Sequence, residues 1–435
     1  MSQLKNKKAE ETFAQALQNH KKNNLQVAKN LYNETLKINT NHIDAHNNLG
    51  IILLQSGELQ NAKSCFEKAI EINSNYASAY NNLGLVFKNL AKLQKAKICY
   101  EKAIKIDPNF FDAHNNLGTL LKRLGELQKA KSCFEKAIKI NPANASVHNN
   151  LGVVFEELGE LQKAKNFTQK AIEIDPNYVG AHWNLHSFAT DVDEALTILK
   201  KLYKIDNKHI RAKIIISALQ AFKGNFNEFD SLIDSSESNH PYTRSIKWIF
   251  SLPKLPMIFF NRWNFYDAII SVADNSRPFY EFGVWNGMSF KYLINNFKKG
   301  FGFDTFTGLP ESWHDSQPKG SYSSFGSVPK IEGGEFIVGN FEDTLPKFFS
   351  KKRPLASLIN FDADLYTSTL CALNYSNKVI DEKSILVFDE LIMHKNWEED
   401  EYKALNEFCD NLGISYEVLA VSFLTSQVAV KLKKN

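Results

Sequence analysis

Acidic residues follow two short apolar runs in the last third of this 435-residue chain. The runs are Leu355–Phe361 and Ser384–Phe388, and the acids after them are Asp362, Asp364, Asp389 and Glu390. If the runs are neighbouring parallel strands, their carboxylates converge and repel one another unless a cation neutralises them. Carboxylate oxygens are the ligands that Mg²⁺ prefers. The pattern therefore predicts a Mg²⁺ site, with separate loop acids and no metal as the alternative.

A glycine-containing segment follows another apolar run, Phe279–Phe282. It reads Glu281-Phe-Gly-Val-Trp-Asn-Gly-Met-Ser289, with glycines at 283 and 287. An acid and two glycines at a strand-to-helix turn let a ligand approach the backbone closely. The Gly-x-x-x-Gly spacing departs from the dinucleotide fingerprint. It resembles the S-adenosylmethionine loop of class I methyltransferases, whose cofactor has no pyrophosphate to place.

Two further polar residues follow apolar runs in the same region. Asp304 comes after Gly300–Phe303, where a carboxylate can accept both hydroxyl groups of a ribose. The alternative role for Asp304 is to cap its own loop. Asn340 comes after Glu335–Val338, where methyltransferases usually enclose adenine.

These residues require a sheet to bring them together. Seven candidate strands alternate with helical stretches from residue 277 to residue 435, which predicts a doubly wound, mostly parallel, seven-stranded Rossmann-like sheet. Ligands bind such a sheet at the carboxyl ends of its strands. The strands are Phe279–Phe282, Gly300–Phe303, Glu335–Val338, Leu355–Phe361, Ser384–Phe388, Ser415–Ala420 and Ser426–Leu432.

Taken together, the motifs resemble the macrocin and mycinamicin O-methyltransferase family over roughly residues 277–431. They are Glu281-Phe-Gly-Val-x-x-Gly-x-Ser289, Gly302-Phe-Asp-Thr-Phe-x-Gly-Leu-Pro-Glu311, Trp313, Asp362-Ala-Asp-Leu-Tyr366 and Phe388-Asp-Glu390. The resemblance implies S-adenosylmethionine and Mg²⁺ as cofactors, and a sugar hydroxyl as the methyl acceptor. It implies that the metal-side acids are Asp362, Asp389 and Glu390, although family members often have Asp at the last position. The implied cofactor-binding residues are Glu281, Gly283, Gly287, Ser289, Asp304 and Asn340.

Three residues are candidates for the general base. Asp362 can take the hydroxyl proton directly, and His394 and His314 have side chains of suitable pKa. His314 lies in the Gly-, Ser- and Pro-rich segment Pro310–Gly334, whose length and composition predict a lid or substrate-contact loop.

The first half of the chain repeats itself every 34 residues. The string Asn-Asn-Leu-Gly begins at Asn47, Asn81, Asn115 and Asn149, and Trp-Asn-Leu-His follows at Trp183. Period and pattern resemble tetratricopeptide repeats, which are antiparallel helix pairs that stack into a solenoid. We expect five repeats and a shortened sixth over residues 8–207, followed by a helical bridge over residues 208–276. The bridge includes one more helix pair, Ile210–Phe222 and Phe226–Ile233.

One asparagine of each repeat is a candidate for partner binding. In this repeat family its position faces the concave surface, and amide groups can pair with an extended peptide backbone. The alternative is a common repeat consensus with solvated amides. The residues are Asn48, Asn82, Asn116, Asn150 and Asn184.

Composition and charge indicate the kinds of partner and the cellular location to expect. The net charge of +4 is small and the charges are interleaved, so no nucleic-acid partner is expected. The start of the chain lacks an apolar leader, and no segment is apolar over the length of a membrane span. The five cysteines show no metal-ligand spacing and are expected to be reduced thiols. A cytoplasmic location is therefore expected.

Two other functions compete with methyl transfer. Asp362-Ala-Asp364 also fits the Asp-x-Asp signature with which a glycosyltransferase holds a metal and a sugar nucleotide. That function leaves Asp304 and the glycine-containing segment without a role. The other alternative is a non-catalytic repeat scaffold with a degenerate nucleotide fold. Methyl transfer is favoured because several different roles are filled at consistent strand ends.

Overall fold

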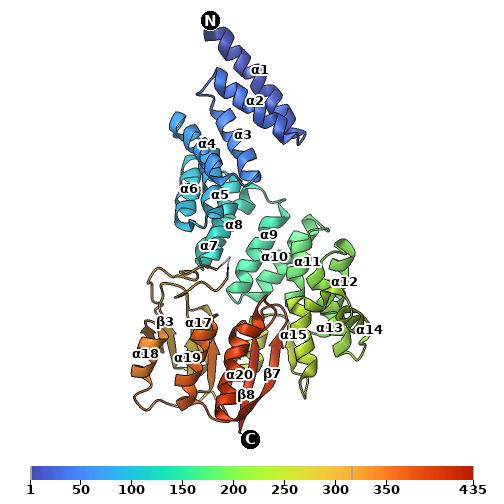
Figure 1. The fold of residues 1–435 in the computed structure, drawn as a ribbon, viewed down its shortest axis with the longest axis vertical. Coiled ribbons are helices and arrows are strands. Elements are labelled where there is room, and N and C mark those ends of the chain that lie inside the picture. Colours follow the sequence, from blue (N-terminus) through green and yellow to red (C-terminus); the bar gives the residue numbers. More distant parts are fainter. Residues whose placement is uncertain (1, 315–316, 435) are drawn as a thin grey trace. The chain divides into compact units, whose positions relative to one another are not determined.

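The computed structural model describes residues 2–314 and 317–434, and these divide into two compact units, one up to Val154 and one from Phe155 onward (Figure 1). The predicted segment boundaries after residues 207 and 276 stay predictions.

The first unit consists of helix pairs with the predicted period. The helices are α1 (Ser2–Lys21), α2 (Leu25–Ile38), α3 (Ile43–Gln55), α4 (Leu59–Ile72), α5 (Ala77–Asn89), α6 (Leu93–Ile106), α7 (Phe111–Arg123), α8 (Leu127–Ile140) and α9 (Ala145–Glu157). Helix α9 continues into the second unit, where α10 (Leu161–Ile174) follows it. The five predicted repeats therefore correspond to α1–α10.

The glycine of each of the first three Asn-Asn-Leu-Gly strings has a packing reason. An aromatic ring sixteen residues later lies against it, so the two helices of a pair approach closely. Any side chain at the glycine would push the helices apart. The pairs are Gly50 with Phe66, Gly84 with Tyr100, and Gly118 with Phe134, where an added Cβ would come within 2.7, 2.5 and 2.8 Å of the ring.

More helices precede the sheet in the second unit. They are α11 (Val179–Leu185), α12 (Val192–Ile205), α13 (Ile210–Phe222), α14 (Asn227–Ile233), α15 (Pro241–Ser251) and α16 (Arg262–Ser271). The predicted shortened sixth repeat corresponds to α11 and α12, and the predicted bridge pair to α13 and α14. Leu199, Leu219 and Ile246 of these helices lie in one hydrophobic core with Phe361 and Val430 of the sheet.

The sheet has eight strands in the order β1-β7-β8-β6-β5-β2-β3-β4, and it is parallel except for β8, which runs antiparallel to β6 and β7. They are β1 (Met257–Phe259), β2 (Phe279–Phe282), β3 (Gly300–Asp304), β4 (Gly334–Val338), β5 (Leu358–Phe361), β6 (Ile385–Phe388), β7 (Ile414–Ser422) and β8 (Val428–Lys434). All seven predicted strands are present. The prediction of seven strands was one short, because β1 is a three-residue edge strand in a Pro-interrupted segment.

Helices cover both faces of the sheet. They are α17 (Met288–Phe297), α18 (Phe341–Phe348), α19 (Tyr366–Ser376) and α20 (Glu401–Leu412), together with α16. Side chains that alternate along a strand enter different cores. In β2, Tyr280 and Phe282 pack with residues of α18–α20, while Phe279 packs with residues of α16 and α17.

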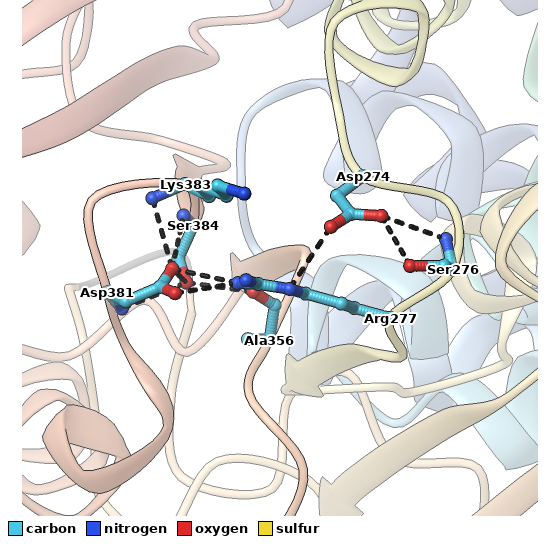
Figure 2. A network of polar contacts seen from close by, with 7 residues as sticks. All are labelled: Asp274, Ser276, Arg277, Ala356, Asp381, Lys383 and Ser384. Carbon is cyan, nitrogen blue, oxygen red and sulfur yellow. Dashed lines mark hydrogen bonds and ion pairs between the residues drawn. The ribbon is translucent and has the colours of Figure 1, made fainter.

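An ionic network joins the segments that enter β2, β5 and β6 (Figure 2). Arg277 Nη1 donates to both carboxylate oxygens of Asp381 at 2.9 Å, and Arg277 Nε lies 3.2 Å from Asp274 Oδ2. The Ser384 hydroxyl donates to Ala356 O at 2.8 Å. These contacts hold together the amino ends of the central strands. The pocket described below lies at the opposite, carboxyl ends.

Candidate functional site

A pocket of about 920 Å³, counting the part open to solvent, lies at the carboxyl ends of β2–β6. This is the edge of the sheet where the sequence places its polar residues, and β2 is flanked there by β3 and β5. Lining it are Arg262, Gly283, Trp285, Asp304, Thr305, Gly308, Leu309, Pro310, Tyr322, Asn340, Phe341, Glu342, Asp362, Ala363, Asp364, Ser368, Asp389 and Glu390.

Gly283 lines the pocket, and its backbone conformation has a structural cause. It has φ +88°, and an added Cβ would lie 1.8 Å from Asp362 O. Only glycine therefore allows the ends of β2 and β5 to lie this close. Gly287 has φ +74° but does not line the pocket, because Pro329 and Ile331 cover it at 3.2 Å from an added Cβ.

Asp304 is held by backbone donors at the end of β3. Its Oδ2 accepts hydrogen bonds from Val284 N at 2.8 Å and Trp285 N at 2.7 Å, and its Oδ1 accepts one from Phe306 N at 2.6 Å. Asp304 thus caps its own loop and also presents a carboxylate to the pocket. Asn340, at the end of β4, lines the same pocket.

Glu281 and Ser289 lie behind the pocket, not in it. Glu281 is fully buried, and its Oε1 accepts from the Ser289 hydroxyl at 2.5 Å and from Asn360 Nδ2 at 2.9 Å. The Tyr266 hydroxyl donates to Asn360 Oδ1 at 3.0 Å. Burial raises the pKa of Glu281 to about 8. Of the six predicted cofactor-binding residues, the pocket is lined by Gly283, Asp304 and Asn340.

The four predicted acids do come together. Asp362, Asp364, Asp389 and Glu390 all line the pocket. Burial and the neighbouring carboxylates raise the pKa of Asp362 and of Asp364 well above the range of an exposed aspartate. Burial followed by the charge of Asp389 raises the pKa of Glu390 to about 7. The four carboxyl groups therefore converge as the sequence predicts, and their mutual repulsion contributes to the raised pKa values.

The arrangement does not fit a Mg²⁺ ion held by Asp362, Asp389 and Glu390. Arg262 Nη2 donates to Asp389 Oδ2 at 2.7 Å, and Gln427 Nε2 donates to Asp389 Oδ1 at 2.7 Å. Both oxygens of that carboxylate therefore already have donors. Within residues 2–314 and 317–434, no three His, Cys, Asp or Glu side chains are grouped as metal ligands.

His394 lies outside the pocket lining. Its Nδ1 is 3.8 Å from Asp400 Oδ2, which also accepts a hydrogen bond from Trp313 Nε1 at 3.0 Å. Burial lowers the pKa of His394 to about 4. His314 is exposed in the predicted loop, next to Asp315 and Ser316, which lie outside the described residues.

The lining residues that were not predicted from the sequence include Arg262, Trp285 and Tyr322. Trp285 and Tyr322 pack edge to face with centroids 5.6 Å apart, and both have positive φ angles. Tyr322 belongs to the predicted lid segment, so the loop could be predicted but not its contact residue. Arg262 comes from α16, outside the segment in which the sequence places the site. No spacing signal connects it to acids more than 90 residues away.

The repeat asparagines form hydrogen bonds between neighbouring repeats. From the second string to the fourth, the second asparagine of each string donates through Nδ2 to the first asparagine of the preceding string. These donor side chains are half-buried. Each bond uses one of the amide hydrogens that the prediction assigned to binding a peptide. The pairs are Asn82 with Asn47 at 3.0 Å, Asn116 with Asn81 at 2.9 Å, and Asn150 with Asn115 at 3.3 Å.

Comparison with known proteins confirms the repeats. Residues 111–144 and 145–178 each match a tetratricopeptide repeat family, and residues 41–109 match a second one. The N-terminal region is thus a tetratricopeptide repeat array, a fold class that commonly binds proteins. The comparison with curated proteins gives no match. No helix among the described residues has the length and apolar character to cross a membrane.

Three solved structures are similar to this chain. PilF of Pseudomonas aeruginosa has 19% identity and a TM-score of 0.44, over 51% of this chain and 98% of that one. MamA has 25% identity and a TM-score of 0.34, over 37% and 94%. YrrB, described as a TPR protein with an unusual peptide-binding site, has 25% identity and a TM-score of 0.36, over 44% and 97%.

Proposed function

We propose that the second unit transfers the methyl group of S-adenosylmethionine to a hydroxyl group, and that the repeats bind a protein partner or a protein-linked substrate. The observation that carries the proposal is one pocket in which Gly283, Asp304 and Asn340 end three neighbouring strands beside the acids of β5 and β6. The mixed, doubly wound sheet around β2 supports a nucleoside ligand at this place. The predicted acceptor is a sugar hydroxyl.

The charge of the pocket favours this cofactor over a sugar nucleotide. Six carboxylates line it, and Arg262 is the basic side chain among them. A sulfonium cation is attracted by that balance, while the pyrophosphate of a sugar nucleotide is repelled. The glycosyltransferase alternative would need a bound cation, held by Asp362 and Asp364 of its Asp-x-Asp signature.

Three pocket residues have a role in this proposal. Asp304, fixed by three backbone donors, would accept a ribose hydroxyl through its remaining lone pair, and Asn340 would border the adenine. When bound, S-adenosylmethionine would supply an electrophilic methyl group, with the thioether as the leaving group. Asp362 takes the hydroxyl proton, a task suited to a carboxylate whose pKa burial has raised.

The confirmed repeats also support a second candidate, a protein-interaction scaffold without catalysis. Both candidates share a repeat surface for a protein partner. They differ only in whether the pocket binds a methyl donor.

Calorimetric titration of S-adenosylmethionine into the full chain tests the proposal. We expect binding that Asp304→Ala abolishes, because the ribose loses its acceptor. Asp343→Ala, which removes an exposed acid of α18 outside the pocket lining, is the matched control and should bind like the wild type. Heat with a sugar nucleotide and Mn²⁺ in place of S-adenosylmethionine would favour the glycosyltransferase. No heat with either ligand would favour the scaffold.

A further inference from the structure

Among the described residues that line the pocket, Arg262 is the one basic side chain. It forms an ion pair with Asp389 at 2.7 Å, and the fully buried Gln427 binds the other oxygen of Asp389 at the same distance. The negative charges of Asp389, Asp362 and Glu390 raise the pKa of Arg262, although burial acts to lower it. A permanent positive charge therefore lies where the sequence predicts a divalent ion.

The residues around Arg262 hold its helix in place. Asn261 caps α16, and its Nδ2 donates to Ser187 O at 2.8 Å. The Trp263 indole donates to Glu156 O at the end of α9. The side chains on both sides of Arg262 are hydrogen-bonded to backbone carbonyls. These bonds fix the position of the Arg262 backbone, from which the guanidinium reaches the pocket.

We propose that Arg262 is the built-in cation of this acid cluster, and that Asp389 is a positioning residue that orients it rather than a metal ligand. A guanidinium stays charged at any physiological pH and matches a carboxylate in shape. It neutralises one acid, and it repels a divalent ion from the neighbouring carboxylates. The proposal deepens the methyl-transfer function by naming the source of positive charge in its pocket.

Titration of Mn²⁺ into the full chain, followed by electron paramagnetic resonance without S-adenosylmethionine, tests this inference. We expect no stoichiometric Mn²⁺ site in the wild type and no change in Asp389→Asn. Arg262→Ala should bind Mn²⁺ about tenfold more tightly or better, because it frees Asp389 and removes the repulsion. Arg262→Lys, which keeps the charge, should behave like the wild type, and Arg262→Ala with Asp389→Asn should lose the gain.

The opposite results would overturn the inference. They are a stoichiometric Mn²⁺ site in the wild type that Asp389→Asn removes, or an Arg262→Ala variant with no gain in Mn²⁺ affinity. Thermal unfolding of each variant shows whether it is folded. If Arg262→Ala does not fold, the wild type, Asp389→Asn and Arg262→Lys still decide the question. Because no methyl donor is present, failure of the methyltransferase proposal leaves this test intact.

Discussion

Glu281 begins the motif that resembles a cofactor loop, yet its carboxyl group contacts the protein interior. It accepts from Ser289 and Asn360, while its Oε2 has no partner. A carboxyl group in such a place is more stable when protonated, which is why its pKa rises to about 8. Its hydrogen bond with Ser289 ties the start of α17 to β2.

This burial makes stability depend on pH. The folded pKa of about 8 exceeds the unfolded value of 4.5, so the folded state binds more protons between these two values. The stabilisation is complete below pH 4.5 and is lost as pH rises towards 8. Glu281→Gln should therefore raise the free energy of unfolding at pH 8, by on the order of 4 kcal/mol, and change it little at pH 4.5.

Urea unfolding at the two pH values measures this difference. Glu332→Gln, an exposed site with the same change, is the control and should show no such pH dependence. A Glu281→Gln variant that is equally destabilised at both pH values would contradict the buried neutral carboxyl group.

At the same scale, the sequence predicted the acids and Asp304 but not Arg262. The acids directly follow strands, and strand ends meet at one edge of a parallel sheet, so their meeting follows from local pattern. Arg262 reaches the pocket only because α16 packs beneath β2 and β5, with Tyr266 bonded to Asn360. Packing between a helix and a distant sheet produces no periodic pattern in the sequence, so it could not be predicted.

At the scale of helices, the repeat junctions show where the pattern breaks. Lys29 binds Glu58 at 2.7 Å, and Lys97 binds Glu126 at 2.6 Å, each pair 29 residues apart. The equivalent partner of Lys63 would be residue 92, but Lys92 stands there. Lys63 instead pairs with Glu67 on its own helix.

Lys92→Glu should restore the missing ion pair with Lys63. We expect the midpoint of thermal unfolding to rise, with a gain of about 0.5 kcal/mol at low salt. High salt should reduce the gain, because it screens exposed charges. The reverse change in the preceding repeat, Glu58→Lys, should lower the midpoint. Equal midpoints for the wild type and Lys92→Glu at low salt would show that this junction does not use the pair.

Strand prediction succeeded where strands are fully buried and failed at a partly exposed three-residue edge strand. The buried runs at β2, β5 and β6 carry four consecutive apolar or buried residues each, which marks them clearly. β1 has three residues, and it becomes a strand only by pairing with β7. Tertiary pairing, not local propensity, creates it.

At the scale of the whole molecule, the helices before the sheet belong to its core. Leu199, Leu219 and Ile246 pack in the same cluster as Phe361 and Val430. The change in sequence pattern near residue 277 therefore lies inside the compact unit that begins at Phe155. The sequence pattern indicates the periodicity of each helix or strand. Which helices share a core with the sheet is visible only in the structure.

The same argument predicts which fragments fold. Residues 145–435 keep α9 whole and all of the second unit, so this fragment should unfold cooperatively and bind S-adenosylmethionine with the affinity proposed for the full chain. Residues 277–435 lose Arg262 and the helices that cover the core, so they should expose apolar surface and bind nothing. Circular dichroism melts and calorimetry distinguish the two. A cooperative melt and binding by 277–435 would mean that the shared core adds little and that Arg262 is dispensable to the pocket.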